Sequence, residues 1–130
     1  MKYLLDTCAL IDAIFTPEKL SVTAKTILEN PKNKLVINVV SLWEIMIKEQ
    51  LGKLSVGSTS AREIQSICDD YQISITPILI EQLDLVRTLD RMNNHGDPFD
   101  RLIISQAITE NLPVITSDRK FSMYPITVIW

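Results

Sequence analysis

Four acidic residues stand just after short apolar segments or early in the helices between them, where their carboxylates can do chemistry. They are Asp6, Glu44, Asp100 and Asp118. In an open α/β sheet, ligands bind beyond the carboxyl ends of the strands, so these acids are expected at one edge. Carboxylates gathered without matching bases repel one another, and a divalent cation relieves that repulsion. Hard oxygen ligands favour Mg²⁺ or Mn²⁺, and such ions suit phosphodiester hydrolysis by a metal-activated water.

Each acid also has a purely structural interpretation. Asp6 followed by Thr7 fits the N-cap of a helix, and Ser41-x-x-Glu44 fits a capping box. Asp118 fits an Asx turn before two basic residues. Caps and turns are commoner than catalytic sites, so the hypothesis of a metal site depends on the four acids being taken together.

The stretch HGDPFDRLII, residues 95–104, contains two acids with different expected tasks. Asp is a favoured N-cap and Pro favours the first helical position, so Asp97 and Pro98 predict the start of a helix. Asp100 heads an apolar stripe, which consists of Ile103, Ile104, Ala107 and Ile108. It therefore lies on the buried side of that helix, as a metal ligand would. For Asp97, an outer-shell contact to metal or substrate is the alternative to capping.

The elements that position these acids are short strands alternating with helices. Strands are expected at residues 3–5, 35–39, 73–76, 114–116 and 126–129, and helices near residues 8–14, 20–30, 42–52, 60–71, 78–92 and 98–111. Ser60 and Glu63 form a capping-box signature at the start of the fourth helix. Strands separated by helices predict an α/β domain with a mostly parallel sheet covered on both faces.

Composition narrows the class of protein. The chain has 130 residues, 46% of them hydrophobic, and a net charge of −3, so we expect one domain over residues 1–130 that meets any polyanion through metal ions. Cys8 and Cys68 match no metal spacing and suit a reducing cytosol. Asp6 and Asp12 interrupt the N-terminal apolar run, which argues against a signal peptide. No stretch reaches the roughly 20 apolar residues that span a bilayer, so we expect a cytoplasmic protein without membrane contact.

Four segments together resemble the PIN domain, and within it the VapC-like toxins of bacterial toxin–antitoxin pairs. The segments are LLDT at residues 4–7, VSLWEIMIKEQLGKL at 40–54, HGDPFDRLIISQA at 95–107 and ITSD at 115–118. The resemblance spans nearly the whole chain, and its strength lies in the order and spacing of the four segments.

The resemblance implies a PIN-like three-layer α/β/α fold with a mostly parallel five-stranded sheet of order 3-2-1-4-5. It implies an endoribonuclease dependent on Mg²⁺ or Mn²⁺ that acts as a toxin, with an RNA substrate, a small antitoxin as partner and pairing into a homodimer. The catalytic residues would be Asp6, Glu44, Asp100 and Asp118. Of these, Asp6 and Asp100 would bind the metal, while Glu44 and Asp118 would complete the acidic ring through water. Cys8 departs from the family, whose members often carry another polar residue there.

Polar residues beside the acids have two interpretations each. Thr7 and Ser117 hydrogen-bond the metal ligands or cap helices. Arg101, Arg119 and Lys120 hold RNA phosphate, or are solvated or ion-paired surface residues.

The remaining residues of interest are a histidine, a tryptophan and a cysteine. His95, the single histidine, is expected in an exposed loop and has no assigned role. Trp43 is expected in the core or an interface rather than as a platform for base stacking, and its apolar helix face suggests self-association. Cys68 is expected to be a buried small hydrophobe.

Two alternatives to the ribonuclease remain open. One is a PIN-like binding module whose activity has been lost, against which the intact acidic set argues. The other is a phosphatase that forms an aspartyl-phosphate after the first strand. Such an enzyme needs a second Asp two residues after the nucleophile, and this chain has Cys8 there.

Overall fold

The computed structural model describes residues 1–54 and 59–130. Its strands are β1 (Lys2–Leu5), β2 (Lys34–Asn38), β3 (Ile73–Thr76), β4 (Val114–Ile115) and β5 (Val128–Ile129). Its α-helices are α1 (Thr7–Phe15), α2 (Val22–Glu29), α3 (Val39–Gln50), α4 (Ala61–Asp70), α5 (Ile80–Thr88) and α6 (Pro98–Glu110). Short 3₁₀ helices are η1 (Pro17–Lys19), η2 (Met92–Asn94) and η3 (Arg119–Met123).

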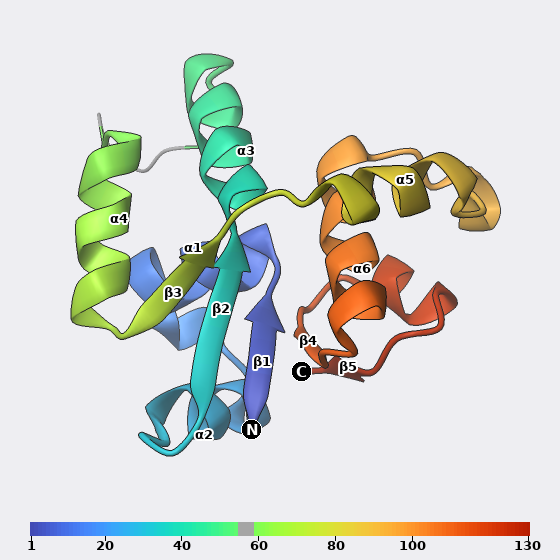
Figure 1. The fold of residues 1–130 in the computed structure, drawn as a ribbon. Helices are drawn as coiled ribbons and strands as arrows, with labels where there is room; N and C mark the ends of the chain where they lie inside the picture. Colours follow the sequence, from blue (N-terminus) through green and yellow to red (C-terminus); the bar gives the residue numbers. More distant parts are fainter. Residues whose placement is uncertain (55–58) are drawn as a thin grey trace.

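All five strands pair in parallel in one sheet of order β3-β2-β1-β4-β5 (Figure 1). The α/β class and the strand order are therefore confirmed. In Figure 1, α4 lies alongside β3, and α5 lies beside α6, whose residues pack with Leu4 of β1 and Val36 of β2 on one face of the sheet. None of the helices in the described ranges is long and apolar enough to cross a bilayer.

The core lies on both faces of the sheet, because successive strand residues point to opposite sides. Leu5 enters a buried cluster with residues of α1, α2, α3 and α4, whereas Leu4 enters a second cluster with residues of α6 and η3. The central strand β1 is thus buried on both sides, as expected for a parallel sheet. Its carboxyl end opens directly onto the edge where the acids lie.

Helix capping confirms one predicted helix start and corrects another. The predicted capping box of Ser60 and Glu63 at α4 is confirmed. The predicted strand over residues 35–39 and helix from residue 42 are wrong at their junction: the side chain of Asn38 accepts from Val40 N at 3.0 Å, so α3 begins at Val39. The capping box proposed for residues 41–44 is therefore also wrong, because these residues lie inside α3.

A buried amide pair joins α6 to the centre of the sheet. Asn38 Nδ2 donates to Gln106 Oε1 at 2.8 Å, and Gln106 Nε2 donates to Thr76 Oγ1 at 2.9 Å. Asn38 and Gln106 are both 0% exposed. Since Asn38 also caps α3, the pair sets the start of α3 against the middle of α6.

Candidate active site

The structure brings the four predicted acids to the carboxyl edge of the sheet. Asp6 directly follows β1, Glu44 lies in the second turn of α3, Asp100 lies in the first turn of α6, and Asp118 lies three residues beyond β4. Their charges act on one another: Asp100 and Asp118 both raise the pKa of Asp6, and Glu44 and Asp118 raise that of Asp100. The edge therefore carries a concentration of negative charge drawn from four elements.

Asp6 is buried and held by two donors. Its Oδ1 accepts from Ala9 N at 2.8 Å, which caps α1, and its Oδ2 accepts from Thr116 Oγ1 at 2.5 Å. Burial raises the pKa of Asp6 to about 7, with these two hydrogen bonds acting in the opposite direction. The capping interpretation is confirmed, and it leaves the metal-ligand hypothesis open because both oxygens stay at the acidic edge.

The hydroxyl beside Asp6 belongs to Thr116 rather than to Ser117. Thr116 is 1% exposed, and its Oγ1 also accepts from Asp118 N at 3.0 Å, whereas Ser117 is exposed. Leu5 and Ile115 are partners in the parallel register, so the residues that follow them face each other. Sequence reasoning missed Thr116, although its place directly after β4 is the signal that identifies it.

Glu44 is 2% exposed and has partners at both oxygens. Thr7 Oγ1 donates to Oε1 at 2.6 Å and lies 3.0 Å from Ser41 Oγ. Lys48 Nζ lies 2.5 Å from Oε2. Burial alone would lower the pKa of Lys48, but the hydrogen bond and charge of Glu44 raise it overall. Lys48 was missed in the sequence, where its position one helical turn after Glu44 is the available signal.

Asp100 is in contact with a buried histidine. His95 Nε2 lies 3.0 Å from Asp100 Oδ2, and His95 Nδ1 lies 2.9 Å from Tyr124 Oη. His95 is 6% exposed, so the prediction of an exposed loop histidine is wrong. Burial and the charge of Asp97 raise the pKa of Asp100 to about 6, against the hydrogen bond of His95. Asp97 caps α6 as predicted, by accepting from Phe99 N and from Asp100 N.

Asp118 makes the predicted Asx turn, in which its Oδ1 accepts from Lys120 N at 3.0 Å. Arg119 and Lys120 are exposed, as solvated residues would be. Arg101 has neither of its predicted roles, because it is 6% exposed and donates to backbone carbonyls. The nearest acceptor is Leu89 O, at 2.5 Å. Arg101 therefore ties the α5–α6 connection to α6 instead of facing RNA.

The donor set fits a hard divalent cation. Among the residues that the structure describes, no three His, Cys, Asp or Glu side chains form a ready-made ligand group. Mg²⁺ does not require one, because it usually keeps several waters and is bound through one or two carboxylates. The raised pKa values of Asp6 and Asp100 show that ionising this edge is costly in the absence of a cation. Asp6 and Asp100 are therefore suitable ligands in chemistry and in place.

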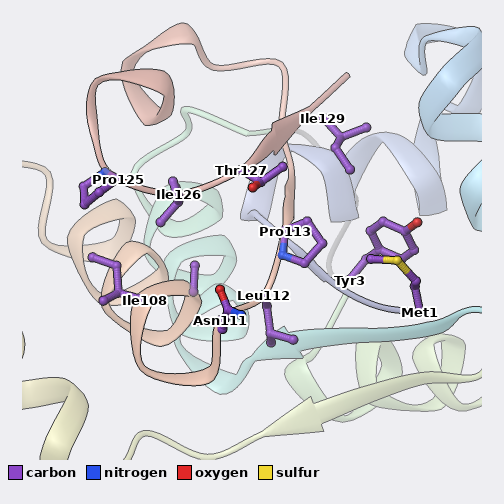
Figure 2. Close-up of a pocket in the computed structure, with 11 residues that line it drawn as sticks. Met1, Tyr3, Ile108, Asn111, Leu112, Pro113, Pro125, Ile126, Thr127 and Ile129 are labelled. Carbon is purple, nitrogen blue, oxygen red and sulfur yellow. The ribbon is translucent and has the colours of Figure 1, made fainter.

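A cavity of about 590 Å³ lies away from the acids (Figure 2). Its lining comes from the C-terminal part of α6, with Ile108, and from residues in or just before the strands, such as Tyr3 of β1, Pro113 before β4 and Thr127 before β5. The carboxyl edge, where the acids lie, is the opposite edge. No carboxylate side chain lines this cavity, so it is separate from the candidate active site.

Three further residues complete the outcome of the sequence predictions. Cys68 is 0% exposed and packs in the core, as predicted, while Cys8 is exposed. Trp43 is 60% exposed, so a place in the core is wrong, and its ring meets Phe99 edge-on at a centroid distance of 5.3 Å. Its role in an interface stays a prediction.

Solved structures share the fold over nearly the full length of the chain. VapBC2 from Rickettsia felis, bound to a fragment of promoter DNA, has 22% sequence identity and a TM-score of 0.70, over 99% of this chain and 98% of the other. VapBC-1 from nontypeable Haemophilus influenzae has 18% identity and a TM-score of 0.68, over 99% and 97%. A toxin–antitoxin complex from Klebsiella pneumoniae has 21% identity and a TM-score of 0.63, over 98% and 96%. The TM-scores show a common fold, and at these low sequence identities they show the fold alone.

The family itself is shown by sequence. No curated protein matches the chain significantly. The sequence profile of the PIN domain, however, matches residues 3–126, a range that contains all four acids and their supporting hydroxyls. With this match over almost the whole chain, the protein belongs to the PIN domain family.

Proposed function

We propose that the protein is a metal-dependent endoribonuclease that acts as the toxin of a toxin–antitoxin pair. The observation that carries the proposal is the gathering of Asp6, Glu44, Asp100 and Asp118 at one edge of a PIN-family sheet, close enough for their charges to interact. The cation would be Mg²⁺ or Mn²⁺. The substrate would be RNA in the cytoplasm, cut by hydrolysis of a phosphodiester bond.

In this proposal, Asp6 and Asp100 hold the cation directly, and Glu44 and Asp118 complete the site through water. When bound, the cation supplies an activated water and neutralises charge that develops on the phosphoryl oxygens. The protein's own part is orientation. Thr116 holds Asp6, and Thr7 holds Glu44, so these carboxylates are fixed before any ligand arrives. Such fixed second partners are typical of metal-ligating carboxylates.

An antitoxin partner is supported by the solved structures that share this fold. The similar structures from Rickettsia felis, Haemophilus influenzae and Klebsiella pneumoniae are VapBC or toxin–antitoxin complexes. Because this chain shares their fold, we infer that its partner is a small antitoxin protein as well.

Pairing into a homodimer is supported by an apolar surface on α3, α5 and α6. A groove of about 230 Å³ there has only apolar lining residues, among them Trp43, Leu83 and Phe99. Trp43 is 60% exposed and Leu83 is 51% exposed, and Ile80, three residues before Leu83 on α5, is 78% exposed. Contiguous exposed apolar side chains of this kind mark protein interfaces.

One observation favours the alternative of a binding module without activity. Lys48 pairs with Glu44, so one of the four acids already has a cationic partner. A module of this kind would bind its partner yet leave RNA intact. The phosphatase alternative has no such support, because Cys8 stands where its second Asp is required.

Cleavage of total cellular RNA by the purified protein tests the proposal. We expect cleavage with Mg²⁺ or Mn²⁺, none in excess chelator, and loss of activity in Asp6→Asn and in Asp100→Asn. Asp69→Asn is the matched control, because Asp69 is an exposed acid at the end of α4. Full activity in either site variant, or in chelator, would refute the proposal. Binding of a partner protein without any RNA cleavage would establish the inactive module.

A further inference from the structure

His95 is a buried polar residue that is not among the four acids of the candidate active site. It is 6% exposed and lies between Tyr124, which is 4% exposed, and the partly buried Asp100. Its backbone is fixed as well: His95 N donates to Met92 O at 2.8 Å, and Arg101 Nη1 donates to its carbonyl at 3.5 Å. The imidazole therefore has a defined position between a phenol and a carboxylate.

The two ring contacts give the hydrogen bonds a direction. When Asp100 is ionised its carboxylate only accepts, so the 3.0 Å contact to Asp100 Oδ2 then requires the proton on His95 Nε2. In the neutral ring Nδ1 is then an acceptor, and the Tyr124 hydroxyl, 2.9 Å away, is its donor. The chain of donation runs from Tyr124 through His95 to Asp100.

The same pattern of support occurs at the other buried acids. Asp6 receives a hydrogen bond from Thr116, and Glu44 receives one from Thr7, in each case from a different element. His95 is the corresponding side-chain donor to Asp100. In addition, it connects Asp100 to the segment after η3, because Tyr124 directly follows η3.

We propose that His95 and Tyr124 are positioning residues that hold the Asp100 carboxylate for divalent-cation binding. This inference rests on the proposed function and adds to it residues to which no role was assigned. Removing such an outer partner typically lowers metal affinity or activity about 10- to 100-fold. A histidine that merely fills the core would affect folding stability and leave the affinity of the folded protein unchanged.

Mn²⁺ titration of the full metal-free chain by calorimetry tests this, with thermal unfolding measured on each variant. His95→Leu removes the donor at similar bulk, and we expect it to bind Mn²⁺ about 10-fold or more weakly. His95→Gln can keep an N–H near the position of Nε2. Because the donor to Asp100 is then retained, we expect its Mn²⁺ affinity to stay within about 3-fold of that of wild type. Tyr124→Phe keeps the ring, and Tyr71→Phe, at a tyrosine that is 58% exposed, is its matched control.

The single histidine allows a second measurement that does not depend on metal or activity. Its ¹⁵N resonances in the metal-free protein report the tautomer without overlap from other imidazoles. We expect the Nε2–H tautomer in wild type, in Tyr71→Phe and in Tyr124→Phe, because Asp100 still accepts from Nε2. In Tyr124→Phe alone we expect the Nδ1 resonance to shift, because Nδ1 loses its hydrogen-bond donor. This arm remains decisive if His95→Leu fails to fold.

The outcomes separate the two proposals. Three outcomes would each overturn the inference while the ribonuclease proposal stood. They are a wild-type Mn²⁺ affinity in folded His95→Leu, equal losses of Mn²⁺ affinity in His95→Gln and His95→Leu, and an Nδ1–H tautomer in wild type. A wild-type chain that neither binds Mn²⁺ nor cleaves RNA would overturn both.

Discussion

Thr116 donates a 2.5 Å hydrogen bond to Asp6 across 110 positions of the sequence. The acid that follows the first strand is thus held by the hydroxyl that follows the fourth, because β1 and β4 are neighbours in the sheet. Parallel pairing brings the residue after each strand to the same edge. The hydrogen bond keeps the Asp6 carboxylate oriented although burial disfavours its charge.

The metal-free protein should lose stability as pH rises from about 4 to about 7. The pKa of Asp6 is raised from 3.8 to about 7, mainly by burial, so in this window the folded state keeps a proton that the unfolded state has lost. Asp100, with a pKa of about 6, acts in the same direction. Below the ordinary Asp pKa of 3.8, both groups are protonated in the folded and the unfolded state, so neither makes stability depend on pH. Unfolding measured in chelator across pH 4 to 8 checks the trend.

Asp6→Asn isolates the contribution of this residue. Asn retains the ability to cap α1, and it removes the cost of a buried charge, so we expect the metal-free variant to be more stable than wild type by roughly 2 kcal/mol at pH 8. The difference should vanish near pH 4. Asp69→Asn, at an exposed acid, should follow wild type throughout. Equal stability of Asp6→Asn and wild type at pH 8 would contradict the assignment of the shift to Asp6.

Lys48→Met should destabilise the metal-free protein and make it respond more strongly to cations. The substitution leaves the buried Glu44 carboxylate without its cationic partner, at a cost of about 1–2 kcal/mol, because the Lys48 side chain is 36% exposed and the pair only partly buried. We expect a larger rise in melting temperature on adding Mn²⁺ than wild type shows.

Lys25→Met is the matched control for this experiment. Lys25 pairs with Glu29 in the same i,i+4 arrangement, but both side chains are more than half exposed. Such pairs contribute little, so its unfolding curve should overlay that of wild type with and without Mn²⁺. A Lys48→Met protein as stable as Lys25→Met would show that Glu44 does not need the pair.

Trp43→Glu should convert a dimer into a folded monomer. Trp43 is 60% exposed, so a charge there costs little within one chain but opposes burial of the apolar surface on α3, α5 and α6 between two chains. Sedimentation over a range of protein concentrations measures the change. Val22→Glu, at a residue of α2 that is 85% exposed, should sediment as wild type does. A wild-type chain that stays monomeric at all concentrations would remove this role for the surface.

The architecture was predictable because helix caps and turn residues, such as Ser60, bound the apolar runs along the chain. The strand order came from the family resemblance, and the acids were found by their places relative to the strands. The start of α3 was mispredicted since Val39 and Val40 are β-branched and favour a strand, whereas Asn38 caps the helix before them. Here one side-chain hydrogen bond, from Val40 N to Asn38, outweighs the strand propensity of the two valines.

Tertiary contacts account for what sequence reasoning missed at the site. His95 is buried through Tyr124, 29 positions away, and no local pattern signals such a contact. The charge of Arg101 predicted a place at RNA phosphate or at the solvated or ion-paired surface, but its acceptors are carbonyls at the end of α5 and in the loop that follows. Thr116 was passed over for Ser117 because the choice depends on the register of β1 against β4.

The amide pair of Asn38 and Gln106 couples the local unfolding of α3 and α6, the helices that carry Glu44 and Asp100. Asn38 Oδ1 is used by the cap of α3, so its amide nitrogen must face Gln106, and Gln106 in turn must present its oxygen. Neither amide can flip without leaving a buried group unpaired. Separation of the start of α3 from the middle of α6 would break this pair, so hydrogen exchange at both places should report a single cooperative opening.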